Sequence, residues 1–334
     1  MKYLVTGGGG YLGLALVEAL RARGDEVVSY SRSRHYRVEA LGARCVVGDL
    51  IEADPLRRAL EGCDGVFHVA AKAGVWGARA EYARVNIDGT RHVVSAALAA
   101  GVPRLVHTSS PSACFDGASQ VRASNDLPLA TSFSAHYPWS KAQAERIALQ
   151  ADCAALSVVA LRPHLIFGRG DPHLLPRVAA RARAGRLVAV GDRANRVSLC
   201  HVANAAHAHV AAMDALRPGA ACAGKAYFVA QEEEVVLWDW LDYLCDALGW
   251  RRSRGPLPLP LARVLGAGCE AAWSLARLPG EPPLTRFTAL QLALSHSYDM
   301  EPARRDFGYV EQIDLAQATG EAIDWLRELE AARP

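Results

Sequence analysis

The stretch VTGGGGYLG, residues 5–13, decides the fold, because it joins a short apolar run to a helical pattern through a glycine-rich turn. Gly7, Gly10 and Gly13 recur at every third position. Between a strand and a helix, such glycines allow a tight turn, close approach of the backbone to a pyrophosphate, and close packing of the helix on the strand. The stretch therefore predicts a dinucleotide site, in preference to a turn that binds nothing.

The rest of the first half alternates between apolar runs and helical patterns, which is typical of a doubly wound parallel α/β sheet of the Rossmann type. The apolar runs are KYLVTG, EVVSYS, RCVVGDL, GVFHVAA, RLVHTSS and LSVVALRP, and the helical patterns lie at 12–23, 55–61, 81–100 and 140–151. We expect residues 1–170 to form the dinucleotide-binding domain, continued by parts of 190–230. Residues 171–334, whose pattern is looser, are expected to form mainly a smaller, mostly helical lobe that binds the substrate.

The composition excludes several classes of partner. The 334 residues carry 37 Lys plus Arg against 35 Asp plus Glu, a formal net charge of +2, which is too small a field for nucleic-acid binding. The eight cysteines form no C-x-x-C pair and the eleven histidines show no zinc spacing, so we expect neither a disulfide framework nor a metal. His201 is interpreted either as a residue near the substrate or as a core histidine. Because MKYLV opens directly as a strand, without a signal-peptide pattern, we expect a cytoplasmic protein.

The end of the second predicted strand indicates which dinucleotide is bound. NAD-binding proteins usually offer an Asp or Glu there to the adenosine ribose, about 20 residues after the glycines. The sequence SYSRSRH offers Arg32 instead, with Arg34 close by, and a guanidinium suits a 2′-phosphate by charge and by forked geometry. We therefore expect NADP, with NAD as the alternative. Asp49, in the later GDL sequence, is expected either to accept a hydrogen bond from the adenine amine or to cap the next helix.

A proton-transfer set follows in the middle of the chain. HYPWSKAQAE, residues 136–145, places Tyr137 and Lys141 four residues apart and hence on one face of a helix. The preceding strand ends in HTSSPS, which brings three serines to the edge of the sheet where ligands bind. A hydroxyl that holds a carbonyl, a phenol that passes a proton, and an ammonium that lowers the pKa of the phenol from about 10 would together serve a hydride transfer.

These motifs resemble the short-chain dehydrogenase/reductase superfamily in its extended branch, and within it the 3β-hydroxysteroid dehydrogenase family. HTSSPSACFDG, YPWSKAQAE, LRPHLIFGRGDPHLLPRV and SYDMEPARRDFGY are similar to the sterol-4α-carboxylate 3-dehydrogenases, and more so to the bacterial 2-alkyl-3-oxoalkanoate reductases of olefin biosynthesis. The motifs do not separate these two groups, although the resemblance covers nearly the whole chain. It implies an NADP-dependent oxidoreductase that interconverts a secondary alcohol and a ketone on a long apolar substrate. Extended members often pair through the helices expected here at 81–100 and 140–151, which implies a homodimer.

The resemblance also assigns roles by position. Ser110 would hold the substrate oxygen, Tyr137 would be the acid/base, and Lys141 would bind the nicotinamide ribose and tune the tyrosine. Asn86 matches the family's asparagine at the helix that faces the active site. The other residues implied at the cofactor are Gly7, Gly10, Tyr11, Leu12, Gly13, Arg32, Asp49, Leu50, Ala70, Ala71, Lys72, Thr108, Pro163 and Leu165.

Two departures from the family pattern leave roles open. Pro111 stands where many relatives have a small residue, so either Ser109 or Ser110 points at the substrate. Lys72 follows the fourth predicted strand, where it is expected to be an exposed loop lysine or, alternatively, to meet a substrate carboxylate or the cofactor phosphates.

Residues 256–278 form an unusually apolar segment in which Arg263, Glu270 and Arg277 recur at intervals of seven. On a helix these charges make one narrow stripe on an otherwise apolar rod, which is too interrupted to span a bilayer. We expect the apolar side to pack mainly in the core or in the substrate pocket. A membrane surface and a second subunit are the alternative partners for it.

Two other functions remain as alternatives. A nucleotide-sugar epimerase or dehydratase would need a basic lobe to hold a diphosphate, and the candidates are Arg177, Arg181, Arg183, Arg186 and Arg196. The apolar character of residues 256–294 argues against that function. A redox-sensing regulator that binds NADP without turnover often lacks the tyrosine or the lysine, and both are present here.

Overall fold

The computed structural model describes residues 1–332 and contains a seven-stranded parallel sheet in the order β12-β7-β5-β4-β1-β2-β3. Its strands are β1 (Lys2–Thr6), β2 (Glu26–Ser31), β3 (Arg44–Val47), β4 (Gly65–His68), β5 (Arg104–Thr108), β7 (Ser157–Pro163) and β12 (Ala226–Val229). Every neighbouring pair is parallel. The strand order reverses between β1 and β4, which opens a crevice at the carboxyl ends of the strands. The predicted Rossmann-type sheet is confirmed.

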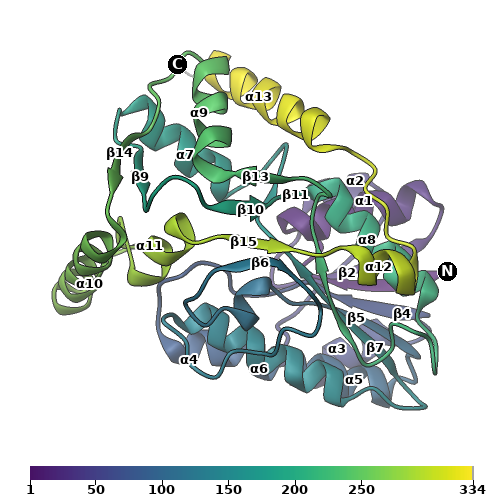
Figure 1. Ribbon diagram of the computed structural model, residues 1–334. Helices are drawn as coiled ribbons and strands as arrows, with labels where there is room; N and C mark the ends of the chain where they lie inside the picture. The colour runs from purple at the N-terminus through teal and green to yellow at the C-terminus, as the bar shows by residue number, and fades with distance from the viewer. Residues whose placement is uncertain (333–334) are drawn as a thin grey trace.

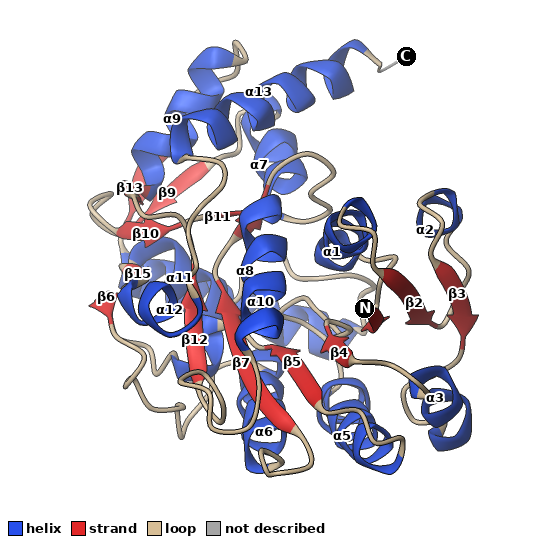
Figure 2. Ribbon diagram, turned by 90° about the vertical axis from the view of Figure 1, so that its right-hand side faces the viewer, coloured by secondary structure: helices blue, strands red, loops and turns tan. Residues whose placement is uncertain are grey.

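Helices cover both faces of this sheet, as Figures 1 and 2 show. One face carries α1 (Tyr11–Ala22) and α8 (Val202–Ala215), and the other carries α3 (Ala53–Leu60), α5 (Gly89–Ala99) and α6 (His136–Gln150). Successive strand residues point to opposite faces. Leu4 and Val5 of β1 accordingly enter different cores, and both are fully buried. Burial on both faces explains why the strand sequences are continuously apolar.

The helix predicted at 81–100 is interrupted in the structure. It consists of α4 (Arg79–Tyr82), a π-helical turn (Ala83–Asp88) and then α5. A π-helical turn changes the direction of the side chains that follow it and is frequent at functional sites. Asn86 lies within this turn and is buried.

A second lobe follows β7 and packs around its own core of leucine and tryptophan side chains. Its helices are α7 (Leu174–Arg183), α9 (Leu237–Ala247), α10 (Leu259–Ala276), α11 (Arg286–Ala293) and α13 (Leu315–Ala331). A small sheet in the order β13-β10-β15-β6 joins β13 (Glu234–Val236), β10 (Arg196–Ser198), β15 (His296–Tyr298) and β6 (Gln120–Ala123). Two short pairs complete it, β8 (Ile166–Phe167) with β11 (Cys200–His201) and β9 (Val188–Val190) with β14 (Arg254–Leu257). The remaining short helices are α2 (Tyr36–Ala40) and α12 (Glu301–Phe307), the latter beside α8.

The expectation that the apolar side of 256–278 packs in the core is wrong. Figure 1 shows α10 at the left-hand edge of the molecule, where it packs on α11. Only Ala262 and Gly266 of this helix are buried, and Gly266 lies so close to Thr285 that a Cβ would collide with the backbone there. Leu261, Val264, Leu265 and Leu275 face solvent instead, with Leu275 86% exposed, whereas Trp273 is partly buried. Among residues 1–332, no helix is both long enough and apolar enough to cross a bilayer.

Candidate active site

The glycine-rich turn after β1 forms a cradle of bare backbone. Gly7 has a φ of 70°, which favours glycine, and its N–H donates to the carbonyl oxygen of Tyr30 at 2.9 Å. A Cβ at Gly13 would collide with the carbonyl oxygen of Gly7, and one at Gly9 would overlap the ring of His35. The turn therefore offers N–H groups at the start of α1 with no side chain in the way, which fits the pyrophosphate of a dinucleotide.

Most of the predicted site residues line one cavity of about 740 Å³ that begins at this turn. These are Gly7, Gly10, Tyr11, Leu12, Gly13, Arg32, Asp49, Leu50, Ala70, Ala71, Thr108, Ser110, Tyr137, Lys141, Pro163 and Leu165. The structure thus brings the glycine turn and the proton-transfer set together from segments up to about half the chain apart. Lys72 and Asn86, of the same predicted set, lie outside this lining.

The side chain of Lys72 is partly exposed outside this lining and pairs with a local acid. Its Nζ lies 3.0 Å from a carboxylate oxygen of Glu81 and 5.3 Å from the ring centre of Tyr82. Its backbone is held by Asn86, whose Oδ1 accepts from the Lys72 N–H at 2.7 Å and whose Nδ2 donates to the Lys72 carbonyl oxygen at 3.1 Å. The Lys72 ammonium thus pairs with the carboxylate of Glu81, a partner that the sequence analysis did not identify.

Asn86 connects this loop to the helix of the predicted acid/base. Its Nδ2 also donates to Oγ of Ser140 at 2.8 Å, and Ser140 donates to the carbonyl oxygen of Tyr137 at 2.8 Å. Asn86 is 2% exposed. The asparagine therefore fixes the loop after β4 and the first turn of α6 relative to each other, and does not itself line the cavity.

Tyr137 stands in the first turn of α6, as expected, beside Ser110. Burial raises the pKa of Tyr137, and its hydrogen bond with the Ser110 side chain opposes that rise. Ser110 also shares a hydrogen bond with Ser112 at 2.9 Å. Ser109 and Ser110 both line the cavity, and Ser109 is almost fully buried, so Ser110 remains the serine predicted to hold the substrate oxygen.

We expected Lys141 to lower the pKa of Tyr137, but in this structure it does not. Its Nζ donates to the carbonyl oxygen of Thr108 at 2.5 Å, and the ammonium is not among the groups that shift the pKa of Tyr137. Burial lowers the pKa of Lys141 itself to about 8, and the carboxylate of Glu145 opposes this. Burial therefore disfavours the charged forms of both Tyr137 and Lys141.

Glu145 and Arg162 form a buried ion pair behind Lys141 that the sequence analysis missed. Arg162 donates from two nitrogens to the two carboxylate oxygens of Glu145, at 2.9 and 2.6 Å, and the side chains are 4% and 1% exposed. Glu145 stands four residues after Lys141 on the same helix face. This four-residue spacing could have drawn attention to Glu145, although not to its partner Arg162.

A second missed network lies beneath the site, around His68 at the end of β4. Its Nδ1 is 2.9 Å from Oγ1 of Thr6, and its Nε2 is 2.9 Å from Oγ1 of Thr90. Thr90 donates its hydroxyl proton to the carbonyl oxygen of Asn86 at 2.6 Å, so the proton shared with His68 is on Nε2. Burial lowers the pKa of His68 to about 3, which keeps the imidazole neutral.

The end of the cavity next to β2 carries one guanidinium, that of Arg32, which lines the cavity and is exposed. Within residues 1–332 it makes no ion pair. Arg34 is held by Glu39 at 2.5 Å. Asp49 lines the cavity with its carboxylate 2.6 Å from Arg84, so its acceptor oxygens are already partly used.

Asp171 is a further lining residue that the analysis did not single out. It is 3% exposed, and its carboxylate accepts from the N–H groups of His173, Leu174 and Leu175 at 2.8, 3.2 and 2.7 Å. These bonds cap α7, whose start lines the cavity. An acid just before an apolar helical pattern, as in DPHLL, is the usual sequence signal for such a cap.

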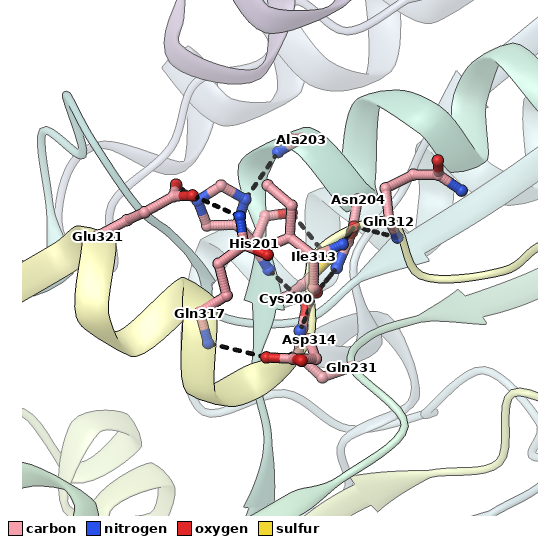
Figure 3. A network of polar contacts seen from close by, with 10 residues as sticks. All are labelled: Cys200, His201, Ala203, Asn204, Gln231, Gln312, Ile313, Asp314, Gln317 and Glu321. Carbon is pink, nitrogen blue, oxygen red and sulfur yellow. Dashed lines mark hydrogen bonds and ion pairs between the residues drawn. The ribbon is translucent and has the colours of Figure 1, made fainter.

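His201 fits the core alternative. It is 4% exposed, accepts from the Ala203 N–H at 3.4 Å, and lies 3.4 Å from Glu321 of α13 (Figure 3). The adjacent Asn204 donates to Gln231 at 2.6 Å. This network connects α13 to α8 and β11, and neither His201 nor Asn204 lines the cavity that holds Tyr137.

A larger cavity of about 1090 Å³ opens beyond the start of α6. His136 lines it, whereas the next residue, Tyr137, lines the cofactor cavity. The aromatic side chains of Trp76, Phe133 and Trp273 contribute to its wall. We refer to it as the outer cavity, whose wall also carries the charged side chains of Glu81, Glu270, Arg277 and Arg286.

Four of the five arginines considered for a diphosphate have local partners, whereas Arg186 is exposed. Arg177 pairs with Glu281 at 2.7 Å, Arg181 donates to the carbonyl oxygen of Pro283 at 2.6 Å, Arg183 pairs with Glu330 at 2.8 Å, and Arg196 pairs with Glu234 at 3.3 Å. Each cation is therefore satisfied by its own local partner. They do not converge on one ligand position.

Known proteins are similar to this chain over nearly its whole length. Residues 4–261 match the 3-beta hydroxysteroid dehydrogenase/isomerase family. The chain is 46% identical over 319 residues to the 2-alkyl-3-oxoalkanoate reductase of Stenotrophomonas maltophilia, with 95% of this chain and 97% of the relative covered. A protein of the same name from Shewanella oneidensis is 41% identical over 323 residues, with 94% and 83% covered.

Similarity extends to a sterol enzyme and to solved structures. The sterol-4-alpha-carboxylate 3-dehydrogenase of Mus musculus is 30% identical over 337 residues, with 98% of this chain and 91% of that protein covered. The structure of MoeE5 in complex with UDP-glucuronic acid and NAD is 25% identical and has a TM-score of 0.74, with 98% and 100% covered. Both comparisons span the sheet and the second lobe.

Proposed function

The chain belongs to the 3-beta hydroxysteroid dehydrogenase/isomerase family of nicotinamide-dependent oxidoreductases, and we propose that it reduces 2-alkyl-3-oxoalkanoates to the corresponding 3-hydroxy acids with NADPH. The observation that carries this proposal is the cavity that Ser110, Tyr137 and Lys141 share with the glycine turn. Two relatives more than 40% identical over nearly the whole chain bear the name of this reaction.

In this reaction the protein binds and orients the substrate and protonates its carbonyl oxygen. NADPH, when bound, supplies the hydride that reaches the carbonyl carbon. Ser110 holds the substrate oxygen by a hydrogen bond, and Tyr137 transfers its phenolic proton to that oxygen as negative charge develops there. We assign to Lys141 the binding of the nicotinamide ribose, because its ammonium is held by the Thr108 carbonyl oxygen at 2.5 Å on the wall of the same cavity. Water exchange through the cavity returns a proton to Tyr137 for the next cycle.

NADP is proposed over NAD on the basis of Arg32. The second strand ends without the acid that would bind the 2′-hydroxyl of NAD, and the Arg32 guanidinium lines the cavity there. A nicotinamide cofactor is common to the family, and NAD is the alternative at this position. The phosphate preference therefore depends on one side chain.

The alternative substrate is a sterol. The mouse relative supports it at 30% identity, and an aromatic-walled outer cavity suits a sterol as well as two alkyl chains. A nucleotide sugar is less suitable, because the arginines near the lobe are paired with local acids and carbonyls. The higher identity to the oxoalkanoate reductases favours the long-chain oxo acid.

The remaining features of this proposal concern the assembly and location. We expect residues 1–170 with parts of 190–230 to bind the cofactor and 171–334 mainly to bind the substrate. A homodimer through α5 and α6 is supported by the exposed Leu98 (42% exposed) among small residues of α5. Light scattering at micromolar concentration tests the dimer, and a monomer mass would refute it.

All eight cysteines are free, which favours the reducing cytoplasm.

The test of the function is a substrate comparison that follows NADPH absorbance. Long-chain 2-alkyl-3-oxo acids should be turned over, and 3-ketosteroids and UDP-sugars should not. Because 3-oxo acids lose carbon dioxide spontaneously, the reverse reaction should also be run, with a 2-alkyl-3-hydroxy acid and NADP⁺. Turnover of a sterol alone, or of a UDP-sugar alone, would replace the proposed substrate.

A further inference from the structure

The ring of His35 lies against the glycine turn. A Cβ at Gly9 would stand 2.2 Å from Cγ and Cδ2 of His35 and 2.4 Å from its Nδ1, so the imidazole occupies the space that a side chain at this position would need. Both residues line the cofactor cavity. The partly buried His35 belongs to the segment after β2, and its ring therefore connects that segment with the turn after β1.

The segment between β2 and α2 folds back on itself beside this contact. Oγ of Ser31 donates to the carbonyl oxygen of Ser33 at 2.8 Å, and Oγ of Ser33 lies 3.3 Å from Nε2 of His35. Arg32, Ser33 and His35 all line the cavity, whereas Arg34 does not. The imidazole thus has Nδ1 near the glycine turn and Nε2 near Ser33.

The charge at this end of the cavity favours an anion. Arg32 lines it and makes no ion pair within residues 1–332. Between residues 26 and 60, the acid in the lining is Asp49, and its carboxylate is already 2.6 Å from Arg84. Imidazole adds an N–H donor, since a ring nitrogen carries a proton in either neutral tautomer and in the imidazolium. Arg32 and His35 therefore both offer donors at this end, one on each side of Ser33 in the chain.

We propose that His35 donates a hydrogen bond to the 2′-phosphate of NADP, so that the preference for NADP over NAD does not depend on Arg32 alone. A glycine turn binds the pyrophosphate, and the end of the second strand binds the adenosine ribose. Because His35 contacts the turn at Gly9 and the segment after β2 at Ser33, its ring flanks the ribose between them. NADP and NAD differ only at the 2′-oxygen of this ribose. The inference rests on the proposed function for its cofactor but not for its substrate.

The alternative role for His35 is to pack on the turn. Packing would affect every adenine nucleotide alike, whereas a phosphate contact affects only those with a 2′-phosphate. His35→Phe separates the two roles, because it keeps a flat ring beside Gly9 and removes both nitrogens. Arg37→Gln is the matched control, since Arg37 of α2 is exposed and does not line the cavity, so that this variant reports on long-range charge alone.

Calorimetric titration of the full-length protein tests the contact. Adenosine 2′,5′-bisphosphate should bind the unmodified protein more tightly than adenosine 5′-monophosphate. His35→Phe should weaken binding of the bisphosphate about tenfold or more, since a hydrogen bond to a charged group is lost, and binding of the monophosphate less than about twofold. Arg37→Gln should bind both nucleotides as the unmodified protein does. Fluorescence titration with NADPH and NADH should give the same selective loss for NADPH in His35→Phe.

Three results would overturn the contact. They are an unchanged bisphosphate affinity in His35→Phe, an equal loss for both nucleotides in that variant, and an equal selective loss in Arg37→Gln. The second result would make His35 a packing residue of the turn, and the third would make the effect one of net charge. An unmodified protein that binds the two nucleotides equally would instead reject NADP as the proposed cofactor, which distinguishes failure of the proposed function from failure of the histidine contact.

Discussion

Thr90 donates a hydrogen bond from its side-chain hydroxyl to the backbone carbonyl oxygen of Asn86 at 2.6 Å. Asn86 lies in the π-helical turn before α5, and Thr90 follows that turn on α5. The same hydroxyl accepts from the buried imidazole of His68. Two residues outside the cofactor cavity thus hold the turn whose asparagine connects the loop after β4 to the helix of Tyr137.

Replacement of this hydroxyl should weaken the site from beneath. Thr90→Val keeps the volume but leaves the Asn86 carbonyl and the His68 Nε2–H without this partner, so we expect a loss of about 1–3 kcal/mol in the free energy of unfolding. Activity should fall as well, because Asn86 loses its fixed position. Thr90→Ser, which keeps the hydroxyl, is the control and should restore most of both quantities. Urea unfolding and steady-state kinetics measure them, and equal values for Val and Ser would disprove this role.

Tyr137→Phe tests the acid/base assignment. It keeps the ring and its packing but removes the proton donor, so kcat should fall by about 10²-fold or more while NADPH affinity is unchanged. Tyr36→Phe is the control, because Tyr36 is 82% exposed and lies on α2. Near-normal turnover by Tyr137→Phe with a genuine substrate would mean that the tyrosine only packs.

The buried Lys141 should leave a signature in the pH dependence of stability. Its folded-state pKa of about 8 lies below the ordinary 10.5, so between these values the unfolded chain binds more protons than the folded one. The free energy of unfolding should therefore rise with pH across this window, by about 3 kcal/mol relative to Lys141→Met. Below about pH 8, the difference in the free energy of unfolding between the protein and Lys141→Met should be constant. Parallel curves for the cofactor-free protein and the variant would contradict the shift.

Glu145→Gln should be strongly destabilising. It leaves the Arg162 guanidinium buried without a counter-charge, and removing one partner of a buried pair typically costs about 3–5 kcal/mol. Glu61→Gln is the control, since Glu61 makes only an exposed pair with Arg57 at 3.1 Å and should change stability by less than about 1 kcal/mol. Thermal or urea unfolding compares the two. Similar small effects at both sites would show that the buried pair is dispensable.

Arg32→Ala should remove most of the preference for NADPH over NADH. The loss is expected in NADPH affinity, whereas NADH affinity should change little, because only the 2′-phosphate would meet the guanidinium. Arg34→Ala is the control, since Arg34 is engaged with Glu39. Cofactor titration by fluorescence measures both. Equal dissociation constants for the two cofactors in the unmodified protein would refute the proposed specificity.

Contacts between distant segments were decided by the tertiary structure. The order of residues in the sequence did not identify the partner of Lys72, whose ammonium meets Glu81. The pKa of Tyr137 is raised by burial, which depends on the surrounding fold and not on the spacing of residues in one helix. The Glu145–Arg162 pair joins α6 to β7, and no local pattern links those two positions.

The sequence by itself determined the parts that depend on local geometry. The glycine turn, the apolar strands and the four-residue spacing of Tyr137 and Lys141 each follow from the backbone repeat of one or two adjacent elements. The apolar stripe of α10 was equally visible as a helical pattern, yet its exposure was not. Periodicity fixes which residues share a face, whereas the packing of α11 against the small residues Ala262 and Gly266 decided that the opposite face would meet solvent.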